Sequence, residues 1–244
     1  MRLARLALLA VAALALTACG EKPEQLGASE QRAVTVAFDR PPGPQQVGFH
    51  QALAAGHFTE AGLAVELRAP AEQGSPIGQL VSGEADLVTV TGVEVLSARE
   101  RGTDVVAIAA LEQPPADLID DQNNPVPVGL VLVARGEQVA EAPETLRLFL
   151  GALARGTRAA IKDPRPGVEA LLDADRKLKS RTLRRAVREA LPGLVPRRNE
   201  LPFGFIDLGH WREYANALRD EGTIGEVPEM GLVATNDLLP GADL

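Results

Sequence analysis

The chain has 244 residues, of which 45% are hydrophobic, and a formal net charge of −8 at pH 7. This length fits one large domain or two small ones, and the apolar fraction is enough to bury a core. A net acidic chain offers no overall electrostatic attraction for nucleic acid. Its single cysteine excludes an internal disulfide.

The first twenty residues have the pattern of a secretory signal. Two arginines precede an unbroken apolar run over residues 6–16, which is too short for a permanent membrane span. The ending LTAC, with Cys19 last, resembles the lipobox of bacterial lipoproteins, in which the cysteine is lipidated and becomes the mature N-terminus. We therefore predict a signal peptide over residues 1–18 and lipidation of Cys19. The alternatives are an ordinary secretion signal and a membrane anchor that is never cut.

A polar segment without periodicity follows, and we interpret residues 19–32 as a lipidated flexible tether. Residues 33–244 would then form the folded part. The prediction places the protein at a cell membrane, held by its lipid and facing the periplasm or the extracellular side.

Strands and helices alternate along the first half of the folded part. Short β-branched or alternating runs predict strands, and apolar residues at helical spacing between capping and stop signals predict helices. We expect strands over 33–38, 63–67, 86–90 and 105–111, a loop over 39–44, and helices over 45–55, from Pro76 onward and over 92–101. This order is typical of βαβ units and predicts an α/β fold with a mostly parallel sheet flanked by helices.

Several segments carry a family resemblance by their order and spacing. They are VTVAFD (34–39), GFHQALAAGHF (48–58), EAGLAVEL (60–67), LVSGEAD (80–86), LVLVA (130–134), PETLRLFL (143–150), ALARG (152–156), AAIKDP (159–164), and residues 211–218, 221–222 and 235–240. Together they resemble the substrate-binding lipoproteins of ABC importers, in the NMT1/THI5-like branch. That branch handles pyrimidine precursors of thiamine and, in relatives, sulfonates or nitrate. The resemblance implies a periplasmic-binding-protein type II fold, a small polar ligand and an ABC permease as partner.

The chain departs from this family between its two halves. Such proteins carry a whole second lobe after the fourth strand, whereas residues 114–129 here are polar and rich in proline. This interval is too short and too polar for a domain, so we interpret it as a loop. Residues 33–113 and 130–244 would then be the two halves of a single lobe.

Open α/β sheets bind ligands at the carboxyl ends of their strands. Asp39 and Glu94 could accept hydrogen bonds from an amine, and the turn before the helix at Pro76 could hold a polar or anionic group. The predicted ligand-binding residues are Asp39, Gln46, Gly74, Ser75, Thr91, Glu94 and Gln113. Alternatively, Ser75 is only a helix cap and Asp39 only a turn residue. By the resemblance, an aromatic residue should follow Asp39, and Arg40 in its place weakens the assignment of a pyrimidine ligand.

Catalysis and cofactors find little support in the sequence. His50, His57 and His210 are isolated, without metal-ligand spacing, and no nucleotide-binding or nucleophile motif occurs. We therefore expect no enzyme, no metal and no cofactor. For His50 we favour a place in the core over one in the groove, and we expect Trp211 to anchor the last helix.

Residues 176–198 contain nine lysines and arginines, with apolar positions at helical spacing. The preferred interpretation is a solvated helix face over a buried stripe, and the alternative is contact with a permease or with anionic lipid. Two functions remain open at this point. One is solute binding for an ABC importer, and the other is an interaction lipoprotein that uses a single lobe as a scaffold.

Overall fold

The computed structural model describes residues 31–70, 74–115, 118–120, 124–198 and 200–241. The predicted signal peptide, Cys19 and almost all of the predicted tether lie outside these residues. The described chain forms one compact unit, which extends from Gln31 onward.

The first half alternates strands and helices as the sequence predicts, with each boundary within about two residues. Its elements are β1 (Arg32–Ala37), the 3₁₀ turn η1 (Pro44–Gln46), α2 (Val47–Ala54), α3 (His57–Glu60), β2 (Leu63–Arg68), α4 (Pro76–Ser82), β3 (Leu87–Thr91), α5 (Gly92–Glu100) and β4 (Val105–Ala110). The short helix α3 was not predicted. It begins directly after Gly56, whose φ of +77° lies in the left-handed region that a residue with a side chain adopts at a cost.

The second half adds one strand and a series of helices. They are β5 (Leu130–Arg135), α6 (Gly136–Glu141), α7 (Pro143–Lys162), α8 (Arg165–Ala174), α9 (Ser180–Ala190), the 3₁₀ turn η2 (Leu191–Gly193), α10 (Leu208–Asp220) and α11 (Met230–Val233). Between β4 and β5, the described residues contain only an isolated bridge, from Ile119 to Pro125.

The five strands form one sheet in the order β2-β1-β3-β5-β4. Strand β1 pairs in parallel with β2 and with β3, whereas β5 pairs antiparallel with β3 and with β4. Strands β1 to β4 therefore share one direction, and β5 runs against them. Strand β5 runs antiparallel because the link after β4 leads directly into it at the same end of the sheet. A parallel strand would need a crossover connection back to the other end of the sheet.

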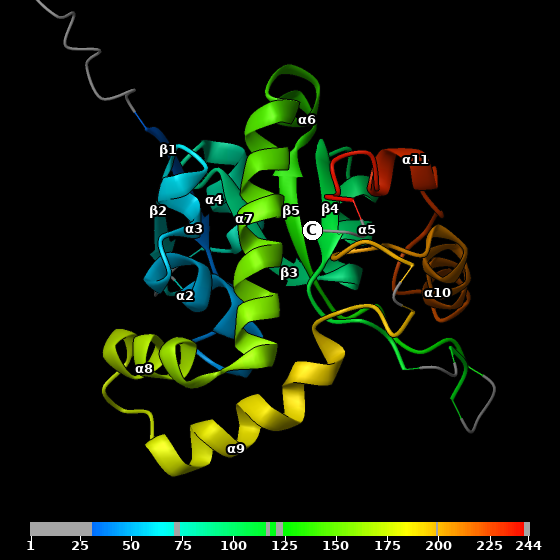
Figure 1. Cartoon of the computed structure of the whole chain (residues 1–244). Coiled ribbons are helices and arrows are strands. Elements are labelled where there is room, and N and C mark those ends of the chain that lie inside the picture. The colour runs from blue at the N-terminus through cyan, green and yellow to red at the C-terminus, as the bar shows by residue number, and fades with distance from the viewer. Residues whose placement is uncertain (1–30, 71–73, 116–117, 121–123, 199, 242–244) are drawn as a thin grey trace, which may run out of the picture. The chain divides into compact units, whose positions relative to one another are not determined.

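Helices cover both faces of the sheet (Figure 1). Helix α7 crosses one face together with α2 and α3, and α5, α10 and α11 lie on the other. Aromatic pairs fill the first layer: the Phe38 and Phe49 rings meet edge to face at 5.3 Å, and Phe58 stacks on Phe149 at 4.9 Å. Trp211 of α10 is buried in the second layer, which confirms it as the anchor of that helix.

Helices α2 and α7 approach each other through two glycines. An added Cβ at Gly48 would collide with the Thr157 hydroxyl, and one at Gly156 would collide with Ala52 and lie 2.6 Å from the Gly48 carbonyl oxygen. The close crossing brings α7 down onto the aromatic layer. It therefore depends on the absence of side chains at these two positions.

We expect Gly156→Ala to lower the free energy of unfolding by about 1–3 kcal/mol, because the new methyl group has no space at the crossing. The matched control is Gly151→Ala in the same helix, where an added Cβ meets no atom within 4 Å. That variant should be as stable as the parent or slightly more stable, because alanine favours the helix. Urea denaturation measures both, and equal stabilities for the two variants would contradict the close crossing.

His50 lies in the core, as predicted. Its side chain in α2 is buried, its ring stacks on Phe38 with centroids 6.4 Å apart, and its Nε2 has no hydrogen-bond partner among the described residues. Burial lowers the pKa of His50 to about 4. The residue is therefore neutral in the folded protein at pH 7.

Because the folded pKa of His50 is below the unfolded value, the unfolded chain binds this proton first as the pH falls. We therefore expect the free energy of unfolding to fall by up to about 3 kcal/mol as the pH is lowered from about 6.5 to about 4. Denaturation curves across this range should show a smaller acid loss for His50→Leu than for the parent. Identical losses would show that the ring titrates normally in the folded state.

Candidate functional site

The carboxyl ends of β1, β3 and β4 lie at one end of the sheet, and β5 begins there. The segments after these strands carry Asp39, Thr91 and Gln113, so the fold brings these predicted site residues to one edge. Most of their polar atoms are already engaged within the protein.

The Asp39 carboxylate is held on both sides. Its Oδ1 accepts a hydrogen bond of 2.9 Å from the buried Thr89 hydroxyl, and its Oδ2 accepts two from the Arg40 guanidinium at 2.8 and 2.6 Å. These bonds raise the pKa of Arg40, and the negative charges of Glu112 and Glu94 add to the effect. Asp39 therefore fixes Arg40 at the edge, and Arg40 lies within the field of both glutamates.

Thr91 and Glu94 close the first turn of α5. One carboxylate oxygen of Glu94 accepts from the Thr91 backbone N–H at 2.8 Å and from the Thr91 hydroxyl at 2.7 Å. This is the reciprocal arrangement of a helix N-terminus, in which a side chain satisfies an otherwise free donor. The other carboxylate oxygen of Glu94 remains available at the edge.

Gln46, Ser75 and Gly74 have local roles. The buried Gln46 side chain accepts from Gly43 N at 3.0 Å and donates to the Arg40 carbonyl at 3.1 Å, which closes the loop after β1. The exposed Ser75 hydroxyl caps α4 by accepting from the Gly78 N–H at 3.0 Å. Gly74 precedes the cap with a φ of +90°.

Two adjoining pockets open beside the end of β4, with volumes of about 370 and 450 Å³. They share the residues Glu112, Gln113, Pro114, Gly129 and Arg197. Of the predicted site residues, Gln113 lines both pockets, while Asp39, Gln46, Gly74, Ser75, Thr91 and Glu94 line neither. The pockets therefore lie toward β4 and β5, with Gln45 of η1 at the side of the second pocket.

Hydrogen bonds fix Glu112 and Gln113 to the start of β5 and to two segments further along the chain. Glu112 Oε2 accepts from the Leu130 N–H at 3.1 Å, and the Gln113 side chain donates to the Phe205 carbonyl at 3.3 Å. The Gln113 N–H donates to the Gly193 carbonyl at 2.7 Å, which attaches η2 to the same edge. These bonds hold the walls of both pockets on the sheet.

Exposed and buried groups face each other across the first pocket. Arg197 is exposed and its side chain has no ion pair within the described part of the chain. His210 and Trp211 line the same pocket from α10 and are buried. Burial lowers the pKa of His210, and the nearby carboxylates of Asp207 and Glu213 and the backbone of Val126 oppose this in part.

Sequence reasoning did not select Glu112, Arg197 or His210 for the site. Glu112 could have been found, since it lies next to Gln113 in the segment after β4, and Gln113 was selected because of its place in that segment. Arg197 and His210 reach the edge from segments more than 80 residues further along the chain, and no local signal marks them. In the described part of the chain, no group of histidine, aspartate and glutamate could hold a metal ion. No helix there is long and apolar enough to cross a membrane.

Comparisons with known proteins agree with this architecture. Residues 43–127 match the family model described as NMT1/THI5 like. The match confirms the resemblance predicted from the sequence, and it spans η1 to the link after β4. No curated protein sequence matches the chain.

Solved structures show the same fold across most of the chain. A Candida albicans gene product with the generic periplasmic binding protein fold aligns at 10% identity, with a TM-score of 0.63, over 85% of this chain and 97% of its own. The zinc-bound ligand-binding component of an ABC-type import system from Staphylococcus aureus aligns at 10% identity, with a TM-score of 0.62. The alignment covers 85% of this chain and 98% of that protein. The alkanesulfonate-binding protein SsuA from Xanthomonas axonopodis pv. citri, bound to MOPS, aligns at 9% identity, with a TM-score of 0.59. The alignment covers 86% of this chain and 100% of that protein. The mixed sheet with flanking helices is thus a periplasmic-binding-protein fold.

The structure generates a test of whether Asp39 has a structural role. We expect Asp39→Ala to lower the free energy of unfolding by about 1–3 kcal/mol, because the buried Thr89 hydroxyl loses its acceptor and Arg40 loses its ion pair. Asp173→Ala, at an exposed position of α8, is the control and should change stability by less than about 0.5 kcal/mol. Chemical denaturation measures the free energy of unfolding of both variants. An Asp39→Ala variant as stable as the control would show that Asp39 has no structural role.

Proposed function

We propose that the chain is an extracytoplasmic solute-binding protein of an ABC importer, attached to the membrane through a lipid on Cys19. The family match over residues 43–127 and the periplasmic-binding-protein fold support this role. The observation that carries it is the pair of pockets at the carboxyl edge of β4, where an open α/β sheet places its ligand.

The proposed ligand is a small polar molecule of the class formed by thiamine pyrimidine precursors, sulfonates and nitrate. Volumes of about 370 and 450 Å³ suit a molecule of this size. Arg197, which has no ion pair within the described residues, offers N–H donors to an anionic group, while Glu112 has one carboxylate oxygen that could accept from an amine. Trp211 and Phe205 supply the apolar walls.

We further propose that the ligand binds to one lobe, in an open groove, because the link over residues 114–129 takes the place of a second lobe. Binding rather than catalysis is proposed because the site brings together no nucleophile with a general base. The second candidate is an interaction lipoprotein in which another protein covers the groove. The apolar wall around Trp211 favours that candidate if no small molecule binds.

Thermal melting of residues 20–244 with thiamine, its pyrimidine precursors, taurine, alkanesulfonates and nitrate tests the proposal. A ligand at about a hundred times its dissociation constant should add roughly 2.7 kcal/mol of stability, which appears as a clear rise in Tm. A cooperative melt that none of these compounds shifts would contradict small-molecule binding and favour the second candidate.

Two variants then locate the ligand. For an anionic ligand, Arg197→Gln should weaken binding by about tenfold without loss of stability, because the side chain is exposed and unpaired. For a ligand with an amine, the corresponding variant is Glu112→Gln, which should weaken binding in the same way. Arg212→Gln removes the same charge from an exposed position of α10 outside both pockets and should leave binding unchanged. Equal effects of Arg197→Gln and Arg212→Gln would exclude the pockets as the site.

A further inference from the structure

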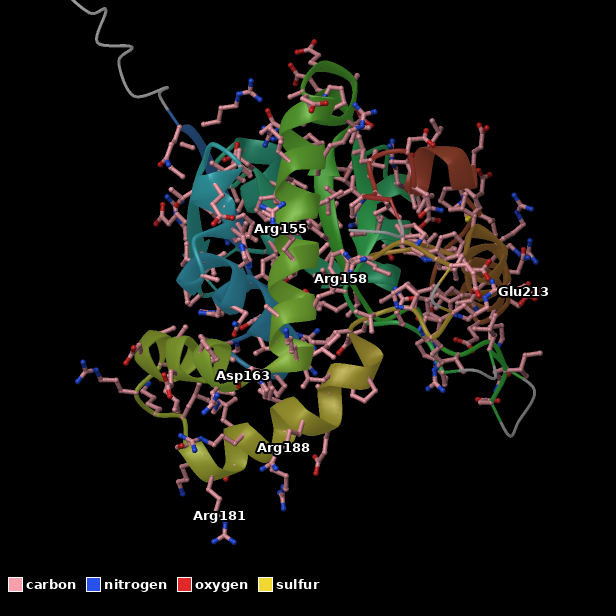
Figure 2. All side chains as sticks on the ribbon, viewed as in Figure 1. Arg155, Arg158, Asp163, Arg181, Arg188 and Glu213 are labelled. Carbon is pink, nitrogen blue, oxygen red and sulfur yellow. The ribbon has the colours of Figure 1, made fainter. Side chains whose placement is uncertain are left out.

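A third pocket, of about 330 Å³, lies between the start of α8 and the middle of α9. It is lined by Asp163, Pro164, Arg165, Val168, Arg184 and Arg188, and it shares no residue with the two pockets at the end of β4. Figure 2 shows Asp163 at the end of α7 and Arg188 on the neighbouring part of α9. Three of the six lining residues are therefore arginines.

The only carboxylate in this lining is already committed. Both oxygens of Asp163 accept hydrogen bonds from the Arg165 guanidinium, at 2.9 and 2.7 Å, and Oδ1 also accepts from the Arg165 N–H at 3.1 Å. These bonds lower the pKa of Asp163 to about 2. Asp163 thus balances the charge of Arg165 and leaves the two arginines of α9 uncompensated.

Arg184 and Arg188 keep most of their donors free. The Arg184 side chain has no hydrogen bond or ion pair within the described residues, and Arg188 uses only its Nε, which donates to the Arg184 carbonyl at 3.2 Å. The two residues are four positions apart on α9, so their side chains lie on one face of the helix, one turn apart. Two guanidinium groups of like charge therefore face the same pocket.

The backbone beneath these arginines is held by packing. Leu183 and Val187 of α9 are buried together with Val168 of α8 in a hydrophobic cluster. This contact fixes α9 against α8 and places Val168 in the wall of the pocket. The arginines are thus presented from a scaffold that does not need to form on binding.

The segment that carries α9 is strongly basic, while Glu169 of α8 adds a negative charge that acts on Arg165. Residues 176–198 contain nine basic residues and one acidic residue, in a chain whose net charge is −8. Three arginines and one aspartate give the lining of the pocket a net charge of +2, which favours an anionic ligand. Guanidinium groups bind tetrahedral oxyanions through paired, charge-assisted hydrogen bonds, which favours a phosphate group over a single carboxylate.

We propose that Arg165, Arg184 and Arg188 form a binding site for a phosphate group, carried either by a free phosphate anion or by the headgroup of an anionic lipid. This site is separate from the proposed solute site and does not depend on it. It assigns a ligand to part of the basic segment, for which the sequence alone favours only a solvated face.

The test is isothermal titration of residues 20–244 at low ionic strength with two probes. Inorganic phosphate represents a free phosphate anion, and glycerophosphoglycerol represents the headgroup of phosphatidylglycerol. We expect at least one probe to bind, and Arg184→Gln/Arg188→Gln to weaken that binding by about tenfold or more. Glutamine is a good helix former, so circular dichroism should show that this variant keeps its helix content.

The matched control is Arg181→Gln/Arg185→Gln, which removes the same two charges from the same helix at exposed positions outside the pocket. It should retain binding to within about threefold, since only diffuse attraction is lost. The probe that binds identifies the source of the phosphate. Equal losses in both double variants would show a diffuse basic surface and overturn the proposal, as would the absence of binding of either probe to the parent chain.

Discussion

The position of β5 is the constraint on which the rest of the structure depends. This strand lies between β3 and β4, is buried along nearly its whole length, and pairs with both neighbours antiparallel. Its N–H and C=O groups would be left unpaired in the core if either neighbour were absent. Since β4 ends and β5 begins at the same edge, the link between them must lie at that edge, where the candidate pockets form.

The same edge shows how closely structural and functional roles can resemble each other. Asp39, Gln46, Thr91 and Glu94 are polar residues at the carboxyl ends of strands, and each is engaged in hydrogen bonds that close a turn or start a helix. Such bonds position the edge without offering many free groups to a ligand. Among the described residues, the free groups instead come from Arg197 and from the remaining oxygen of Glu112, around a wall that contains Trp211.

Local patterns were sufficient for most of the fold. Ser75 before Pro76 predicted the cap and start of α4, and the β-branched run after residue 32 predicted β1. The direction of β5 could not be found in this way, because its six residues have the same apolar character in a parallel or an antiparallel strand. The pockets were also beyond local reasoning, since Glu112, Arg197 and His210 meet only after α7 to α10 have been placed.

The central claim is that the end of β4 holds a small ligand on a single lobe. Nuclear magnetic resonance of ¹⁵N-labelled residues 20–244, titrated with an alkanesulfonate and with a thiamine pyrimidine precursor, tests it most directly. The account predicts saturable shifts of the amide signals of Gln113, Gly129 and Arg197, which lie around the two pockets. Shifts confined to the turn at Ser75 and Gly78, or no saturable shift with either compound, would contradict it.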